Sequence, residues 1–95
     1  DPEHNFLIGL AYFDGIDVET DKERGIALIT SAAEAGLVEA MDMLYSYYNE
    51  ASINYNEALK WIEKIYNFYL EKIGEEHPDT LTSLNNLAQI FFFFF

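Results

Sequence analysis

The residues of this chain best able to do chemistry are carboxylates that follow one another at short spacing near the N-terminus. Asp17, Glu19 and Asp21 stand at the first, third and fifth places of a calcium-binding loop pattern. Such a loop also needs a glycine at its sixth place and a bidentate glutamate at its twelfth, but this chain has Lys22 and Leu28 there. We therefore interpret the segment as a solvated turn whose carboxylates stabilise the start of a helix, and we expect no metal site.

Histidine is the other side chain that transfers protons near neutral pH, and the chain has two. His77 directly precedes Pro78, while His4 belongs to a different helical segment. Because no second histidine or cysteine stands near His77, we interpret it as a residue that packs in a turn. The sequence also has no glycine-rich phosphate loop, nucleophile elbow or zinc-binding helix motif. We expect no enzymatic activity, no catalytic residues and no cofactor.

The charge of the chain argues against several classes of partner. Its 95 residues include 17 Asp and Glu against 5 Lys and Arg, a formal net charge of -12. This charge repels phosphate backbones and anionic membrane surfaces, so we expect neither nucleic acid nor a membrane as partner. The tyrosines and the tryptophan are then better explained by packing between helices than by stacking on bases. The absence of cysteine excludes disulfides and thiolate metal sites.

The length suits one domain, and nothing in the sequence resembles a membrane span. The longest apolar run, residues 90–95, is far shorter than the roughly 20 residues that cross a bilayer. We expect a soluble chain. Its compartment stays open, with the cytoplasm slightly favoured.

Apolar residues recur at helical spacing along almost the whole chain, and no strand pattern of useful length is present. This periodicity predicts an all-α fold. Thr20 and Asn54, each followed three residues later by a glutamate, are capping-box patterns that mark two helix starts. The expected helices span residues 3–13, 20–35, 38–50, 54–73 and 78–91. In the last of them we expect a buried stripe of Leu81, Leu84, Leu87, Ala88 and Phe91.

The helices also repeat along the chain. Ile8, Leu44 and Leu87 begin similar segments at offsets of about 36 and 43 residues, close to the ~34-residue unit of helix-turn-helix repeats. The pattern predicts an α-α superhelix, a solenoid of antiparallel helix pairs with about two and a half repeats. We expect small residues to let these helices nest as stacked hairpins, namely Gly9, Ala32, Ala58 and Ala88.

Residues 6–40 resemble one Sel-like repeat. The resemblance is carried by the small, aromatic and turn residues Ile8, Gly9, Tyr12, Gly15, Val18, Asp21, Ala32, Ala33, Gly36 and Ala40. Two positions depart from the pattern: Asp17 stands where a second glycine is usual, and Gly25 where alanine is usual. The loop and the closest contact between the helices are therefore expected to differ from the family's.

Residues 41–91 are similar to tetratricopeptide repeats of the kinesin-light-chain type, most clearly after Tyr55. The matching segments are Tyr55-Asn56-Glu57-Ala58-Leu59, Gly74, His77-Pro78-Asp79-Thr80 and Ser83-Leu84-Asn85-Asn86-Leu87-Ala88. Together the two resemblances imply a single helical-repeat domain over residues 1–91. Its expected parts are a Sel-like repeat at 3–36, a tetratricopeptide-like repeat at 37–74 and a half repeat at 78–91.

In such a solenoid the first helix of each pair lines the concave surface, where a ligand meets residues one turn apart. The resemblance to tetratricopeptide units implies that Asn85 holds a peptide backbone, since an amide both donates and accepts hydrogen bonds. Each polar residue of the set can equally be an ordinary solvated one. The predicted partner-binding residues are Phe6, Leu10, Phe13, Glu39, Asp42, Ser46, Asn49, Thr82, Asn85 and Gln89.

The sequence thus predicts an acidic scaffold or adaptor that binds a peptide or protein through its concave groove. The alternative is a purely architectural or oligomerisation segment of a larger repeat protein. Residues 92–95 are all phenylalanine, and we interpret them as a truncation or a cloning remnant. Because the last helix would lack a second-helix partner, we also expect self-association through the incomplete C-terminal repeat.

Overall fold

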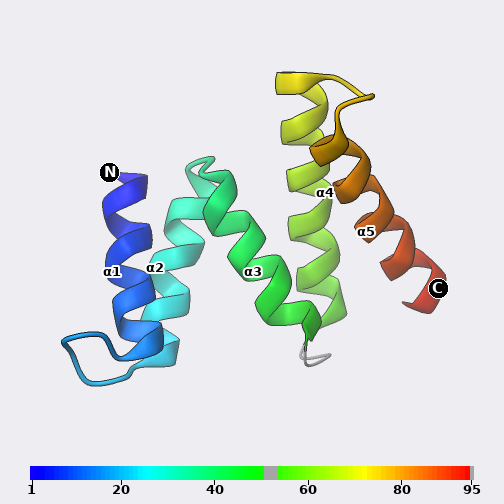
Figure 1. Ribbon diagram of the computed structural model, residues 1–95. Helices are drawn as coiled ribbons and strands as arrows, with labels where there is room; N and C mark the ends of the chain where they lie inside the picture. The colour runs from blue at the N-terminus through cyan, green and yellow to red at the C-terminus, as the bar shows by residue number, and fades with distance from the viewer. Residues whose placement is uncertain (51–53, 95) are drawn as a thin grey trace. The chain divides into compact units, whose positions relative to one another are not determined.

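The computed structural model describes residues 1–50 and 54–94, and side chains as far as Phe93. Within these residues the chain is all-α, without a strand (Figure 1). The helices are α1 (Pro2–Asp14), α2 (Lys22–Glu34), α3 (Val38–Glu50), α4 (Tyr55–Ile73) and α5 (Pro78–Phe94). The predicted all-α class and the order of the helices are therefore confirmed, and α5 runs three residues further than expected.

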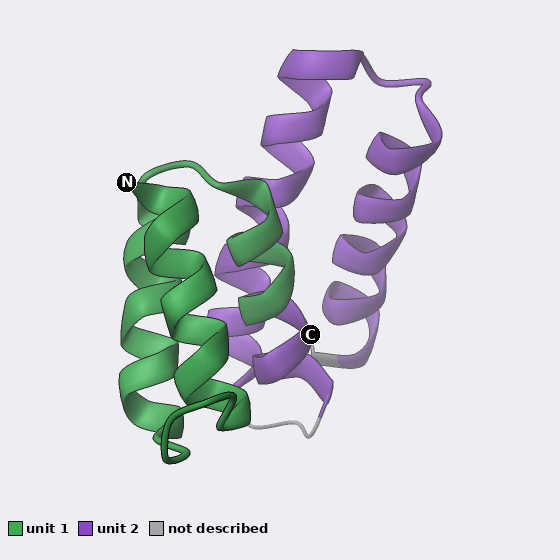
Figure 2. Cartoon of the chain, turned by 60° about the vertical axis from the view of Figure 1, so that its left-hand side comes forward, with its two compact units in different colours: residues 1–44 green, residues 45–95 purple. Residues whose placement is uncertain are grey.

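The chain divides into two compact parts, unit 1 (residues 1–44) and unit 2 (residues 45–95), shown in Figure 2. Unit 1 holds α1, α2 and the first half of α3. Unit 2 holds the end of α3 with α4 and α5. The division lies inside α3, whereas the predicted repeats meet after residues 36 and 74. Among the described residues no helix combines the length and the apolar character that a membrane crossing requires.

Side-chain oxygens cap the starts of three helices. The backbone N–H of Glu57 donates to Asn54 Oδ1 at 3.2 Å, which confirms the predicted start of α4. At α2 the predicted cap is wrong, because Asp21 and not Thr20 accepts, from the N–H of Arg24 at 3.1 Å. A carboxylate is the stronger acceptor here, since its charge also interacts favourably with the helix dipole. Asp1 accepts from the N–H of Glu3 in the same way at α1.

In unit 1, α1 and α2 form an antiparallel hairpin whose backbones nearly touch (Figure 1). Gly9 and Gly25 are both buried at this contact. A β-carbon on Gly25 would lie 2.7 Å from the carbonyl oxygen of Gly9 and 2.8 Å from the backbone nitrogen of Phe13. These distances are too short for any side chain. Glycine at position 25, where the resembled repeat has alanine, is thus what permits this approach.

Gly25→Ala should therefore destabilise the chain. At an exposed helix position, alanine stabilises the helix by about 1 kcal/mol relative to glycine. At position 25 the added methyl group would instead overpack against fixed backbone, which costs about 1 to 3 kcal/mol. We expect a net loss of roughly 1 kcal/mol in unfolding free energy, measured by urea denaturation. Ser31→Ala, on the exposed side of the same helix, is the control and should leave stability unchanged or slightly higher. A Gly25→Ala protein as stable as its parent would contradict the contact.

The loop between α1 and α2 contains Asp17, with a φ of 61°. This is the left-handed region, which aspartate tolerates and glycine enters without strain. Asp17 is the position where the Sel-like pattern has a second glycine. The backbone conformation that a glycine would suit is therefore present, although the glycine is not.

Asp17→Gly should raise stability. The left-handed conformation costs an L-residue about 1 to 2 kcal/mol, and glycine would remove this strain. Glycine also gives the unfolded chain more conformational entropy, which cancels about 0.5 to 1 kcal/mol of the gain. We expect a gain of roughly 0.5 kcal/mol in unfolding free energy. Glu19→Gly is a matched control, because it removes the same charge from the same loop at a residue without a positive φ. It should lower stability, and equal effects of the two substitutions would rule out backbone strain as the cause.

In unit 2, α5 packs against α4 through a face that the sequence analysis did not predict. Thr80, Ser83 and Ile90 are buried, with Leu87 half-buried between them. The expected stripe is instead largely exposed: Leu81 by 50%, Leu84 by 42% and Phe91 by 46%, with Ala88 exposed as well. The buried stripe is displaced by one residue, which on an α-helix is a rotation of about 100°.

The cause of this error is that α5 carries apolar residues on more than one face, so hydrophobicity alone does not select its orientation. Small side chains at Thr80 and Ser83 let the helix approach closely, and Ser83 Oγ donates to the carbonyl of Thr80 at 2.8 Å. Of the small residues expected between helices, Gly9, Ala32 and Ala58 are buried. The prediction for Ala88 is wrong, because the rotation turns it outward.

Candidate binding pocket

The described residues of unit 2 line a pocket of about 270 Å³ that is open to the surface. Three helices contribute to it: the end of α3, the start of α4 and the last turns of α5. The residues that line it are Tyr45, Asn49, Glu50, Tyr55, Gln89, Ile90 and Phe93.

Helix geometry places these side chains. Tyr45 and Asn49 are four residues apart on α3, and Gln89 and Phe93 are four residues apart on α5, so each pair lies on one face one turn apart. Ile90 is 4% exposed and fixes the rotation of this part of α5. Tyr55 is the first residue of α4, directly after the capping Asn54.

The pocket lining is polar and aromatic, with one charge. It presents two phenols, one phenyl ring, two carboxamides and the carboxylate of Glu50. No basic side chain is among the described residues that line it. Carboxamides donate and accept hydrogen bonds, phenol hydroxyls do the same, and ring faces attract cations. The lining suits a polar or positively charged group, and it offers no positive charge to an anion.

Burial raises the pKa of Tyr45 above the ordinary value of 10.0, because the phenolate is poorly solvated there. The pKa of nearby Tyr48 is raised as well, first by burial, then by the negative charge of Glu57, and last by Tyr47, whose phenolate repels a second one. Tyr45 is therefore a neutral phenol at physiological pH. Its hydroxyl can donate a hydrogen bond to a ligand in the pocket.

Two of the predicted partner-binding residues meet in this pocket, Asn49 of α3 and Gln89 of α5. Ser46, Thr82 and Asn85 are exposed in unit 2 but do not line it. The remaining predicted residues belong to unit 1: Phe6, Leu10 and Phe13 are half-buried, and Glu39 and Asp42 are exposed. None of the predicted set is buried.

The sequence analysis missed the other residues of the pocket. Tyr45 and Tyr55 were assigned to packing between helices, although both are only half-buried. Glu50 lies at a helix end, where periodicity gives little information about direction. Phe93 was interpreted as part of a truncation or a cloning remnant, whereas α5 continues through it. The detectable signal was the four-residue spacing that links Tyr45 to Asn49 and Phe93 to Gln89.

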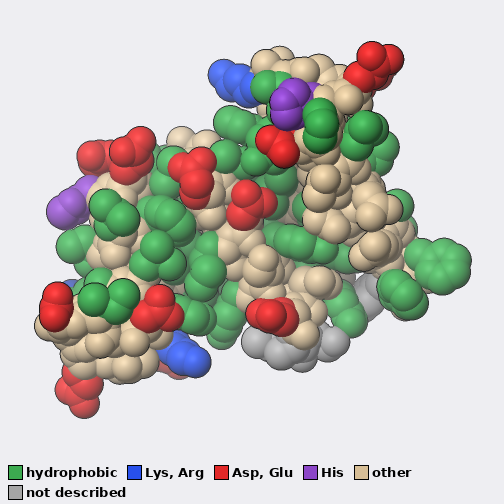
Figure 3. All heavy atoms as spheres, in the orientation of Figure 1, with side chains coloured by type: hydrophobic (Ala, Val, Ile, Leu, Met, Phe, Trp, Pro, Cys, Tyr) green, Lys and Arg blue, Asp and Glu red, His purple; other side chains and the backbone are tan. Residues whose placement is uncertain are grey.

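Most of the chain's few cations lie over its own aromatic rings. Lys22 Nζ is 5.2 Å from the ring centroid of Phe13, and the Arg24 guanidinium carbon is 4.5 Å from that of Tyr12. Lys60 and Lys64 lie 4.9 and 5.9 Å from the ring of Trp61. Four of the five basic residues are thus used in cation–π contacts. On the face in Figure 3, acidic side chains are spread over both units and basic ones lie near the margins.

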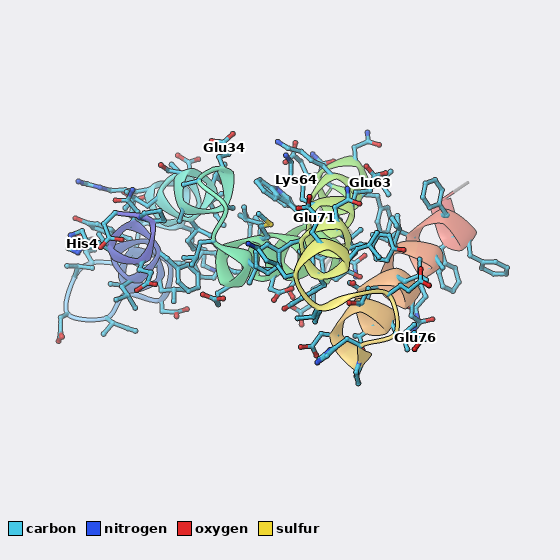
Figure 4. All side chains as sticks on the ribbon, turned by 90° about the horizontal axis from the view of Figure 1, so that it is seen from above. His4, Glu34, Glu63, Lys64, Glu71 and Glu76 are labelled. Atoms are coloured by element: carbon cyan, nitrogen blue, oxygen red, sulfur yellow. The ribbon has the colours of Figure 1, made fainter. Side chains whose placement is uncertain are left out.

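The histidines stand apart from this pocket. His77 Nδ1 accepts a hydrogen bond from the backbone N–H of Asp79 at 3.1 Å, so His77 caps the start of α5. His4 is exposed on α1 and is labelled in Figure 4. Within residues 1–50 and 54–93, no group of three or more His, Asp or Glu side chains is arranged to hold a metal ion.

No protein-family model matches the chain, and no curated protein or solved structure does so either. The resemblance to Sel-like and tetratricopeptide repeats therefore stays a prediction from the sequence. The pocket and the exposed residues of the described chain are the observations from which a function can be proposed.

The raised pKa of Tyr45 predicts a loss of stability at high pH. As the pH rises above about 10, tyrosine in the unfolded chain ionises while Tyr45 in the folded chain stays protonated. The protonated phenol of Tyr45 contributes fully to the free energy of unfolding below about pH 10, and this contribution is lost as the pH rises through the raised pKa. Urea midpoints measured from about pH 8 to pH 11 should therefore fall more steeply for the parent than for Tyr45→Phe. Parallel falls would show that Tyr45 is not desolvated.

Proposed function

We propose that this chain is a non-catalytic interaction module that binds an extended peptide segment of a partner protein. The observation that carries the proposal is the pocket in unit 2, where Asn49 and Gln89 come from two helices to one site. An extended peptide has backbone N–H and C=O groups without partners. A carboxamide can pair with both at once, and the phenols of Tyr45 and Tyr55 add further donors and acceptors.

We further infer that the helices belong to a solenoid and that the peptide lies in its concave groove. The inference is supported by the antiparallel packing of consecutive helices, α1 against α2 as expected within a pair and α4 against α5 as expected between one pair and the next (Figure 1). It is also supported by the burial of small residues at Gly9, Ala32 and Ala58. In such an array Asn49 and Gln89 would occupy the first helices of successive pairs, which are the helices that line the groove. The module would then act as a scaffold or adaptor.

A second function, that of an architectural or oligomerisation segment, is favoured by a different observation. Leu81, Leu84 and Phe91 form an exposed apolar stripe along α5 with helical spacing. A stripe of this kind can pack against its own copy about a twofold axis. In that case the groove residues would be ordinary surface groups. The oligomeric state in solution would then depend on the apolar stripe of α5.

Selection from a library of random peptides tests the first function. The immobilised chain should enrich a family of related sequences, and a representative peptide should bind the parent measurably by titration calorimetry. Asn49→Ala with Gln89→Ala should weaken this binding by about tenfold, because two hydrogen-bonding side chains worth about 0.5 to 1.5 kcal/mol each are removed. Asn67→Ala, an exposed amide of α4 outside the pocket, is the matched control and should bind as the parent does.

The two functions give different outcomes. Failure to enrich any peptide family, or enrichment that the double variant leaves unchanged, would reject peptide binding at this pocket. Light scattering of the same samples then measures the mass in solution. A chain that enriches no peptide family but forms a dimer, which Leu84→Glu converts to a monomer, would support the oligomerisation role instead. Circular dichroism of each variant shows whether its helices are intact.

A further inference from the structure

We propose that the pocket of unit 2 binds the cationic side chain of a lysine or arginine, so that the bound peptide is basic. The inference rests on the proposed function in one respect, because the cationic side chain would belong to the bound peptide. Whether the pocket prefers a cation can be measured without any partner protein.

The charge at the pocket comes from Glu50, the last residue of α3. A helix C-terminus carries partial negative charge on its last carbonyl groups, and it disfavours an acidic side chain. Glu50 therefore stands where it does not help the helix, and α3 has no basic residue in its last turn to balance it. Glu50 and the end of α3 together give this part of the pocket a negative potential.

Aromatic rings supply a second attraction for a cation. Tyr45, Tyr55 and Phe93 line the pocket together with Glu50. The face of each ring is electron-rich and attracts ammonium and guanidinium groups. The chain already uses this interaction elsewhere, since Lys22, Arg24, Lys60 and Lys64 lie over rings. Figure 4 shows Lys64 extending from α4.

The amides complete the chemistry, because the side-chain oxygens of Asn49 and Gln89 can accept N–H donors from the cation. The volume of about 270 Å³ is slightly below the range of pockets that hold whole small molecules, roughly 300 to 1,000 Å³. It suits one long side chain. A divalent metal is a poor occupant, since it requires about six oxygen ligands and usually more than one carboxylate.

Binding of blocked amino acids tests this preference directly. The probes are the N-acetyl amides of lysine, of arginine and of norleucine, which is as long as lysine but uncharged. Titration of isotope-labelled protein should shift the side-chain amide resonances of Asn49 and Gln89 with the lysine or the arginine probe. Norleucine should leave them in place. Whichever cation gives the larger shift identifies the preferred side chain.

Glu50→Gln should weaken the binding of the cationic probe by about threefold, the effect of one partly exposed charge pair. The change should not unfold α3, because removing a negative charge at a helix C-terminus is favourable. Glu63→Gln is the matched control: this exposed carboxylate of α4, labelled in Figure 4, lies outside the pocket and its loss should change binding little. Added salt should weaken the binding to the parent.

Equal shifts with norleucine and lysine, no binding of either cation, or equal losses for Glu50→Gln and Glu63→Gln would overturn the inference. Peptide binding could still hold in each of these cases, because the peptide selection measures it separately. Conversely, cation binding without any enriched peptide would reject the proposed function and leave the pocket's preference standing.

Discussion

The packing of α5 against α4 is the constraint on which the candidate site depends. Thr80 and Ser83 bring the first turns of α5 close, and Ile90 is buried toward its end. Together they fix one rotation of the helix. That rotation places Gln89 and Phe93 at the pocket and leaves Leu81, Leu84 and Phe91 in contact with solvent. The polar site and the exposed apolar stripe therefore both result from the same rotation of α5 against α4.

This rotation of α5 has an energetic cost at Thr80. Its hydroxyl is fully buried and has no hydrogen-bond partner among the described residues, whereas the hydroxyl of Ser83 is satisfied within the helix. A buried polar group without a partner costs about 1 to 3 kcal/mol. The close approach of the two helices and the burial of Ile90 must offset this cost. Such a balance shows why residue type alone did not identify the buried face.

The sequence was sufficient to predict the elements but not the rotation of every helix. Helix ends follow from local chemistry, such as the hydrogen bond from Glu57 to Asn54, and local chemistry is readable from neighbouring residues. The buried face of α4 was predictable because Ala58, Trp61, Ile62 and Ile65 form one apolar stripe. In α5 two stripes compete, and only the tertiary contact decides between them. Asn49 and Gln89 were found because residues one turn apart along α3 and α5 were predicted to line a groove. Tyr45 was instead assigned to packing between helices, and Phe93 to a truncation or a cloning remnant.

The surroundings of Trp61 have a practical consequence for spectroscopy. It is the chain's single tryptophan, it is completely buried, and its indole N–H has no hydrogen-bond partner within the described chain. An indole shielded from water emits at short wavelength, and its excitation is separable from that of the seven tyrosines. Trp61 is therefore a built-in fluorophore for the α4 core. Its fluorescence can report the unfolding of this core without any dye attached at the pocket.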